Sequence, residues 1–429
     1  MKPTITLDRT LVAVNVYGIV HLLLELAAPA AVAAARPPID AVVVLDRSGS
    51  MDGAPLEAVK EATANLLRLL GPDDRLGVVT FDDEVDLVLP LAHHDLHLVS
   101  AQLRGIRSGG STNLSGGWLK AMEILAALGR TDALRRIMVL TDGHANAGII
   151  DPARLRDLAK AAHSQRISTS MIGFDDGYDE VLLASMADAG GGNDYWCAGP
   201  DQTAAVFAAE FEGLASVVAQ NISVEIRPAE GVEPAVLNDA PITIVPGGLQ
   251  IALGDAYGGE QRRVVAMLRI GTPTVVGPVQ LGEIVIRWAS TVGDVELHTV
   301  TIPVTINATD DPDAADRATD ATVIEHVNVL RAAQERRTAH DRIANGDVDG
   351  AAAALSRTID LLAPLPACAA EVQQARFDLE ELQHGAWTAA SSKRLFSTQR
   401  STEKGRRSRF DQDPGEPSGP PSPRRPRAR

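Results

Sequence analysis

The chain has 429 residues, of which 45% are hydrophobic, 22% charged and only 3% aromatic. This composition is typical of a globular protein of two or three domains with aliphatic cores, and it excludes a chain that is disordered throughout. The formal net charge of −16 argues against nucleic-acid binding by the folded body. The two cysteines, Cys197 and Cys368, are far apart in the sequence, so the pattern predicts neither a disulfide framework nor a zinc cluster.

The first 36 residues are apolar, but their pattern favours strands over a secretory signal peptide. In the stretch HLLLEL (21–26), three leucines fall on one face, while His21 and Glu25 fall on the other. This period of two is typical of a half-exposed strand. We expect a β-hairpin over residues 1–36 with a turn near Tyr17 and Gly18. Because no uninterrupted apolar stretch is long enough to span a bilayer, we expect a cytoplasmic protein.

Strands and helices alternate between residues 37 and 217. The run AVVVLD (41–46) is continuously apolar, as in a strand that is covered on both faces. The stretch PLEAVKEATANLLRLL (55–70) has apolar residues at helical spacing and ends before Gly71 and Pro72. The same alternation continues to the apolar helix TAAVFAAEFEGLASVV. The pattern predicts a doubly wound α/β domain with a mainly parallel sheet.

The remainder of the chain shows three different sequence patterns. Between 218 and 308, short strands alternate with Gly/Pro turns, which predicts an antiparallel β-sandwich. The N-terminal hairpin would be marginally stable alone, so we expect it to join this sandwich, with the α/β domain (37–217) inserted between sandwich strands. Residues 318–385 predict a helical module made of a helical hairpin and a third helix. Residues 393–429 are basic and poor in apolar side chains, which predicts a disordered tail.

Oxygen-bearing side chains follow two apolar strands of the α/β domain, and others lie within a glycine-rich loop of the same domain. The segments are LDRSGS, GGSTNLSGG and LTDGHAN. Because the carboxyl ends of parallel strands meet at one edge of a sheet, where ligands bind, we expect the three segments to meet there. They offer Asp46, Ser48, Ser50, Thr112 and Asp142. This all-oxygen set suits a hard cation such as Mg²⁺, and its neutral hydroxyls would leave the metal able to accept a carboxylate from a partner.

These residues resemble the metal-ion-dependent adhesion site (MIDAS) of von Willebrand factor type A domains. The D-x-S-x-S loop, the Thr of the second loop and the Asp of the third match Asp46, Ser48, Ser50, Thr112 and Asp142. The resemblance covers residues 37–217 and implies binding of Mg²⁺ or Mn²⁺, with metal-mediated contact to an acidic residue of a partner protein. With its flanking sandwich and helical regions, the chain resembles bacterial proteins that carry this domain.

Other interpretations of the first loop stay open. One is that Asp46 and Ser50 are only helix caps ahead of PLEAVKEA. Enzymes are less favoured, because Ser48 lacks the G-x-S-x-G surroundings of a hydrolase nucleophile and stands where haloacid dehalogenase phosphatases carry a second Asp. No GxxxxGK[ST] loop is present. The histidines at 93, 94 and 97 lie at the predicted start of an exposed helix and are expected to be solvated rather than metal ligands.

We therefore expect a non-enzymatic binding and scaffold protein that uses a divalent cation to contact an acidic residue of a partner. Two other functions remain open. One is an accessory subunit of an AAA+ ATPase complex, similar to the MoxR-associated and chelatase relatives of this domain. The other is a surface adhesin, which would require a cleaved N-terminal segment. The basic tail is expected to be solubilising, with nucleic acid or acidic lipid as alternative ligands.

Overall fold

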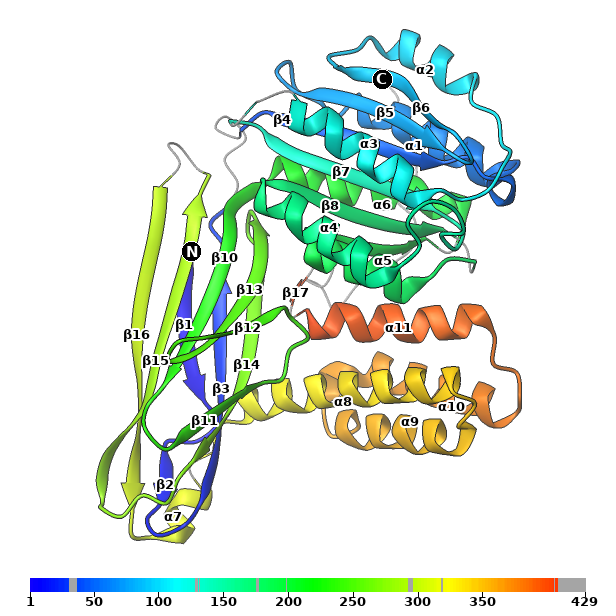
Figure 1. Cartoon of the computed structure of the whole chain (residues 1–429). Helices are drawn as coiled ribbons and strands as arrows, with labels where there is room; N and C mark the ends of the chain where they lie inside the picture. Colours follow the sequence, from blue (N-terminus) through cyan, green and yellow to red (C-terminus); the bar gives the residue numbers. More distant parts are fainter. Residues whose placement is uncertain are drawn as a thin grey trace, which may run out of the picture.

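The structure is a computed structural model that describes residues 1–30, 37–127, 130, 132–174, 177–197, 199–291, 296–317, 319–404 and 406–407. An α/β domain stands at one end of a long β-sandwich, and a stack of helices lies beside the sandwich, beneath the α/β domain (Figure 1). The chain enters the α/β domain from sandwich strand β3 (Gly18–Ala27) and returns to the sandwich in β10 (Val217–Pro228). The predicted insertion of the α/β domain between sandwich strands is therefore confirmed.

The α/β domain has a six-stranded sheet in the order β6-β5-β4-β7-β8-β9. Its strands pair in parallel except β6, which is antiparallel to β5. The strand bounds are β4 Ile39–Asp46, β5 Arg75–Phe81, β6 Val85–Ala92, β7 Leu134–Thr141, β8 Ile167–Phe174 and β9 Gly191–Cys197. The helix bounds are η1 Gly49–Met51, α1 Ala54–Leu66, α2 Leu96–Arg104, α3 Leu114–Ala127, α4 Pro152–Ser164, α5 Glu180–Ala189 and α6 Pro200–Ala215.

Helices cover both faces of this sheet, which explains its continuously apolar strands. Apolar residues of α1, α2 and α6 pack on one face, and those of α3, α4 and α5 pack on the other. Every residue of β4 is buried as a result. This is the predicted doubly wound α/β fold with a mainly parallel sheet.

The sandwich consists of two sheets that enclose one apolar core. One sheet has the order β1-β3-β14-β11, with β17 added beside β14, and the other has the order β12-β13-β10-β15-β16-β2. The bounds not yet given are β1 Lys2–Leu7, β2 Leu11–Ala13, β11 Val232–Val236, β12 Ile242–Val245, β13 Gly248–Tyr257, β14 Gln261–Ile270, β15 Gly277–Ser290, β16 Glu296–Thr309 and β17 Arg406–Arg407.

The N-terminal segment differs from the predicted simple hairpin. The strand that pairs with β3 is β1, whereas β2, which directly precedes the turn, crosses to the other sheet and pairs in parallel with β16. Buried Asp8 stabilises the crossing, because its carboxylate accepts a hydrogen bond from the backbone N–H of His21 (2.9 Å) and lies 2.8 Å from the ring Nδ1 of His21. Beyond it, Val12 is buried in the sandwich core. One short segment thus contributes to both sheets.

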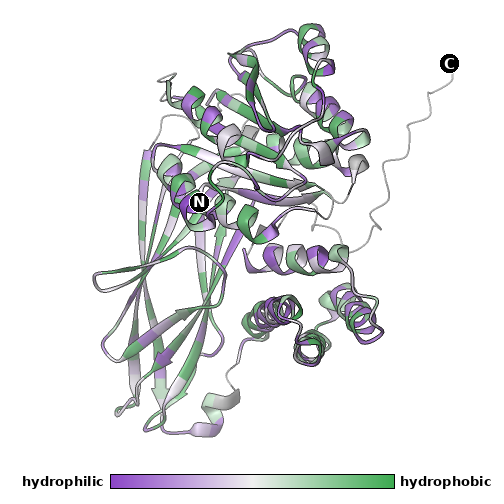
Figure 2. Ribbon diagram, turned by 45° about the vertical axis from the view of Figure 1, so that its right-hand side comes forward, coloured by the Kyte–Doolittle hydropathy of each residue, from purple (hydrophilic) through white to green (hydrophobic). Residues whose placement is uncertain are grey.

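The helical region contains more ordered structure than predicted. Its helices are α7 Pro312–Arg317, α8 Ala321–Ala344, α9 Val348–Leu362, η2 Pro366–Cys368, α10 Ala369–Gln383 and α11 Ala389–Glu403. Both hydrophilic and hydrophobic residues lie along these helices (Figure 2). None of the helices in the described part of the chain is long and apolar enough to cross a membrane.

The predicted start of the disordered tail at residue 393 is wrong. Residues 393–403 form most of α11, and buried side chains on this helix include Lys393 and Arg400. Polar contacts with other parts of the chain order this helix, so its low apolar content is not a sign of disorder. The remainder of the predicted tail, residues 408–429, lies outside the described residues.

Strand β3 provides a test of the role of the N-terminal segment. Leu24 is buried in the sandwich core, so Leu24→Ala should lower the free energy of unfolding by about 2–5 kcal/mol. Ile19→Ala, at the exposed start of the same strand, should change it by less than about 1 kcal/mol. Urea denaturation of both variants measures the difference. Equal stability of Leu24→Ala and wild type would show that β3 does not belong to the core.

Candidate metal site

The predicted metal-binding residues come from three loops at the carboxyl edge of the α/β sheet. Asp46 ends β4, Ser48 and Ser50 follow it, and Asp142 directly follows the neighbouring strand β7. Thr112 lies two residues before α3. Ser50 is exposed, whereas the other four side chains are buried. The cluster therefore has a buried floor and one solvent-facing hydroxyl.

Hydrogen bonds connect four of the five side chains. The Ser50 hydroxyl donates to Oδ1 of Asp142 (2.7 Å), and the Oγ atoms of Ser48 and Ser50 are 3.2 Å apart. Oδ1 of Asp46 accepts from the backbone N–H of Ser48 at 2.8 Å. These contacts join the first and third loops directly.

Thr112 lies against the third loop. A Cβ atom built on Gly143 would lie 3.2 Å from Oγ1 of Thr112 and 3.9 Å from Oγ of Ser50. The Thr112 hydroxyl is thus next to the residue that follows Asp142, on the side where Ser50 lies. The structure brings all five predicted residues to one place.

Two further residues, which no sequence motif indicated, hold the loops in position. The Thr141 hydroxyl donates to Oδ2 of Asp46 at 2.6 Å. The side chain of Asn146 accepts from the backbone N–H of Thr112 (2.8 Å), and the N–H of Asn146 donates to the Thr112 carbonyl (3.2 Å). Both residues lie within the LTDGHAN segment, so their polar side chains beside Asp142 were the only available signal.

The electrostatics of the cluster favour a bound cation. Burial raises the pKa of Asp46 to about 6, the hydrogen bonds from Thr141 and Ser48 oppose that rise, and the charge of Asp142 adds to it. The adjacent Arg47 side chain is paired with Asp82 (3.0 Å) and Asp86 (2.9 Å) of a neighbouring loop and strand. A divalent ion would compensate the charges of the two carboxylates.

The donor set fits a hard cation. Two carboxylates and three hydroxyls are the oxygen ligands that Mg²⁺ and Mn²⁺ accept. Among the described residues, no group of three or more His, Cys, Asp or Glu side chains could hold a metal. In this cluster the three hydroxyls would supply the protein ligands beyond the two carboxylates. The histidine alternative is not supported, because His94 places its Nε2 against the carbonyls of Leu76 and Pro90.

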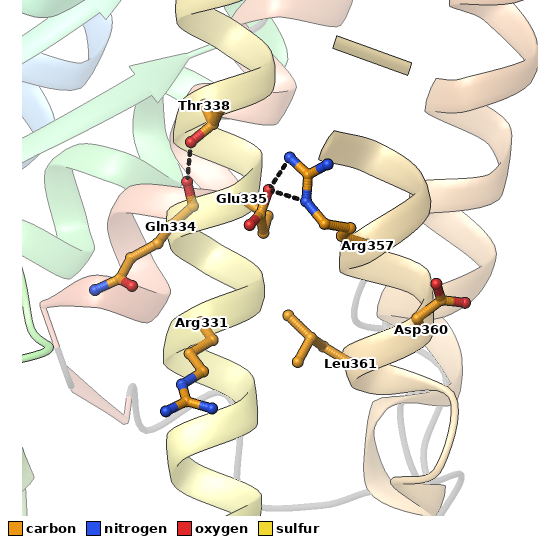
Figure 3. Close-up of a pocket in the computed structure, with 7 residues that line it drawn as sticks. All are labelled: Arg331, Gln334, Glu335, Thr338, Arg357, Asp360 and Leu361. Carbon is orange, nitrogen blue, oxygen red and sulfur yellow. Dashed lines mark hydrogen bonds and ion pairs between the residues drawn. The ribbon is translucent and has the colours of Figure 1, made fainter. Parts of the chain in front are cut away.

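A groove in the helical region has a different character (Figure 3). Residues of α8 and α9 line it: Arg331, Gln334, Glu335, Thr338, Arg357, Asp360 and Leu361. Glu335 and Arg357 form an ion pair of 2.7 Å. Because no residue of this lining set is a His or Cys, the groove offers no soft-metal ligand.

Comparison with known proteins identifies the α/β domain. Residues 40–219 match the family model of the von Willebrand factor type A domain. The α/β domain is therefore a von Willebrand factor type A (VWA) domain. The family assignment that the five-residue motif suggested is confirmed.

The relatives extend the likeness beyond this domain. An uncharacterised protein of Synechocystis is 27% identical over 335 residues, which are 75% of this chain and 77% of that protein. The E3 ubiquitin-protein ligase WAV3 of Arabidopsis thaliana is 29% identical over 55% of this chain, but this match spans only 31% of the ligase. The solved structure of a von Willebrand factor type A protein from Catenulispora acidiphila superposes with a TM-score of 0.72 at 19% identity, covering 87% of this chain and 89% of that one. The last comparison shows a shared fold.

Replacing the buried carboxylate of Asp46 should stabilise the metal-free protein. At pH 7, above its pKa of about 6, folding buries a charge. Asp46→Asn keeps groups that can hydrogen-bond to Thr141 and Ser48. We therefore expect this substitution to raise the free energy of unfolding in EDTA by about 1–3 kcal/mol. The gain should shrink at pH 5, where the folded wild type has largely taken up a proton. Chemical denaturation at both pH values measures it.

Asp40 provides the matched control. It is equally buried at the other end of β4, but it pairs with Arg75 (2.7 Å) and Arg130 (3.4 Å). Asp40→Asn should therefore destabilise the protein, because it removes one side of a buried ion pair. If Asp46→Asn were destabilising to the same degree, the Asp46 charge would be well compensated without metal.

Proposed function

We propose that this protein is a metal-dependent protein-binding scaffold whose Mg²⁺ or Mn²⁺ ion coordinates an acidic residue of a partner. Asp46, Ser48, Ser50, Thr112 and Asp142 would hold the ion. The observation that supports this function is the meeting of two carboxylates and three hydroxyls at one sheet edge, with Ser50 open to solvent. Nothing in this arrangement requires a chemical step.

The charge balance explains why a partner carboxylate would bind. Two carboxylates bring two formal negative charges to a divalent ion, while hydroxyls are neutral and weak ligands. The bound ion would keep affinity for a further anionic oxygen, and a partner Asp or Glu would displace a water molecule from it. The same balance predicts modest metal affinity without a partner. Metal and partner would then strengthen each other's binding by the same factor.

A non-enzymatic role fits the cluster better than hydrolysis. The hydroxyl of Ser48 lies beside that of Ser50 rather than beside a histidine base. The likeness to a ubiquitin ligase covers less than a third of that protein, so its activity does not transfer to this chain. We place the protein in the cytoplasm. The alternatives, an AAA+ ATPase subunit and a surface adhesin, are separated by whether an ATPase co-purifies with it and whether the N-terminus is cleaved.

Removing a ligand should strongly weaken metal binding. We expect Asp142→Ala to weaken Mg²⁺ binding at least about 100-fold, because changes even to outer-shell partners cost 10–100-fold in metal sites. Asp86→Ala is the control, because it removes an exposed carboxylate that pairs with Arg47. Calorimetric titration with Mg²⁺ and with Mn²⁺ measures the affinities. Unchanged Mg²⁺ affinity in Asp142→Ala would refute the proposed site, and partner capture that persists in EDTA would refute the metal-mediated contact.

A further inference from the structure

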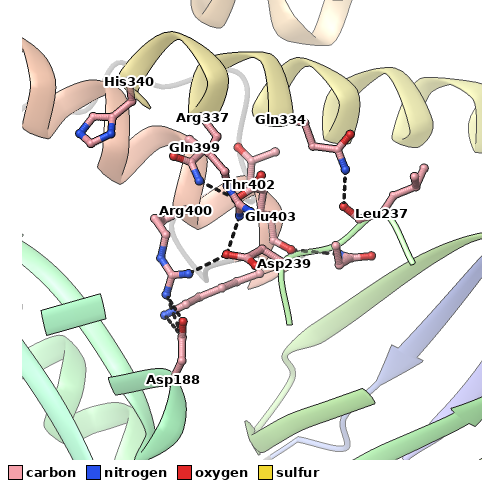
Figure 4. Close-up of polar contacts among 12 residues, drawn as sticks. Asp188, Leu237, Asp239, Gln334, Arg337, His340, Gln399, Arg400, Thr402 and Glu403 are labelled. Atoms are coloured by element: carbon pink, nitrogen blue, oxygen red, sulfur yellow. Dashed lines mark hydrogen bonds and ion pairs between the residues drawn. The ribbon is translucent and has the colours of Figure 1, made fainter. Parts of the chain in front are cut away.

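Helix α11 connects the VWA domain to the rest of the molecule. It lies between the VWA domain and α8 (Figure 1). The guanidinium of Arg400 contacts Asp188 of α5 (2.7 Å), Asp194 of β9 (3.1 Å) and Asp239 (3.0 Å), which lies between sandwich strands β11 and β12. Figure 4 shows Arg400 reaching both Asp188 and Asp239. One buried side chain thus binds the VWA domain and the sandwich.

Lys393 makes a second attachment two turns earlier on the same helix. Its ammonium group donates to the carbonyl of Tyr178 (2.7 Å) and to Oε2 of Glu180 (2.7 Å), and it lies 3.9 Å from the centre of the Tyr178 ring. Residues seven apart share one face of a helix, so Lys393 and Arg400 hold the two ends of α5. His340 of α8 also contacts Glu180, at 3.3 Å.

The start of α5 adjoins the metal site. A Cβ atom built on Gly177 would lie only 2.6 Å from the carbonyl oxygen of Asp142, so the two backbones are in close contact. The ring of Tyr178 packs against Gly173 of β8, where a Cβ atom would overlap it. An unbroken series of contacts therefore runs from Lys393 through Tyr178 and Gly177 to Asp142.

We propose that α11 is a positioning clamp for the metal site, so that docking of α11 and binding of the divalent cation strengthen each other. The proposal rests on the proposed metal site. Lys393 restrains Tyr178, and Tyr178 in turn restrains its neighbour Gly177. Gly177 contacts the backbone of Asp142, whose side chain would be a metal ligand. Without this restraint, metal binding would itself have to order the loop that carries Asp142. The conformational entropy lost in that ordering would weaken the affinity for the metal. Linkage then requires that the bound metal stabilise docked α11 by the same factor.

The character of the α11 interface suits a contact that can open. Among the described residues of α11, the buried side chains are Ser391, Lys393, Leu395, Gln399, Arg400 and Glu403, of which only Leu395 is apolar. Ion pairs to acidic residues therefore supply much of the attachment. Such pairs contribute less net free energy than apolar burial because desolvation offsets their attraction. A modest coupling energy can therefore shift the equilibrium between docked and undocked α11.

Arg394 offers a matched control on the neighbouring position. It faces the helical region instead of α5, and it pairs with Asp378 (2.8 Å) and Glu381 (2.8 Å). Arg394→Met therefore removes a cation and its ion pairs from the same turn of α11 without touching Tyr178. Lys393→Met removes the contact to α5 while keeping a long unbranched side chain.

The first measurement is Mg²⁺ affinity of the full chain by calorimetry. Lys393→Met should weaken it about 5-fold or more, the lower end of typical coupling between sites, whereas Arg394→Met should change it less than about twofold. Equal affinities in wild type and Lys393→Met would overturn the clamp but leave the proposed function intact. Absence of Mg²⁺ binding in the wild type would overturn both.

The second measurement uses the wild type and needs no substitution. Hydrogen–deuterium exchange of residues 389–403 should slow when Mg²⁺ binds, and this slowing should be lost in Asp142→Ala. A residue with a merely structural role would not make α11 exchange respond to the metal. Exchange that is unchanged or faster with Mg²⁺ would overturn the proposal.

Discussion

Two carboxylates held close together at one edge of a parallel sheet are the constraint on which the site depends. Asp46 is fully buried at the end of β4, and Asp142 follows the neighbouring strand β7. A buried carboxylate needs hydrogen bonds or a cation, since an uncompensated charge in the interior is costly. Thr141 and Ser48 supply these hydrogen bonds to Asp46. The like charges of the two carboxylates remain, and they make the pair suited to a divalent ion. The sheet and its two helical layers are what make this crowding possible, because they fix both strand ends.

The remainder of the molecule restrains this domain from outside. Two chain connections join it to the sandwich, and α11 contacts it from much further along the sequence, since Arg400 and Asp194 are 206 residues apart. Its contacts are mainly ionic, with Arg400 and Lys404 both bonded to Asp194. Burial opposes ionisation of Asp194, but the two cations outweigh it and hold the pKa of Asp194 well below its usual range. An interface of this kind fixes orientation through directed bonds, and it separates more readily than a large apolar interface would.

The fold of this protein tolerates extensive sequence divergence. A chain with 19% identity superposes on 87% of this protein with a TM-score of 0.72. Such divergence is expected where an apolar pattern, rather than particular side chains, specifies the core. The polar contacts of α11 are of a different kind, because they depend on individual residues such as Lys393 and Arg400. Proteins that share the fold can therefore differ in these contacts.

The sequence by itself determined the fold class and the candidate ligands. Continuous apolar strands and helical periodicity are local signals, and the carboxyl ends of parallel strands must meet at one edge, so Asp46 and Asp142 could be placed together from their positions alone. The crossing of β2 between sheets and the order of residues 393–403 emerged only from the tertiary structure. Helix α11 has few apolar residues, and the carboxylates that bind Arg400 lie about 160 to 210 residues away. An ion pair between distant residues leaves no periodic pattern along the chain, so only folding brings its two members together.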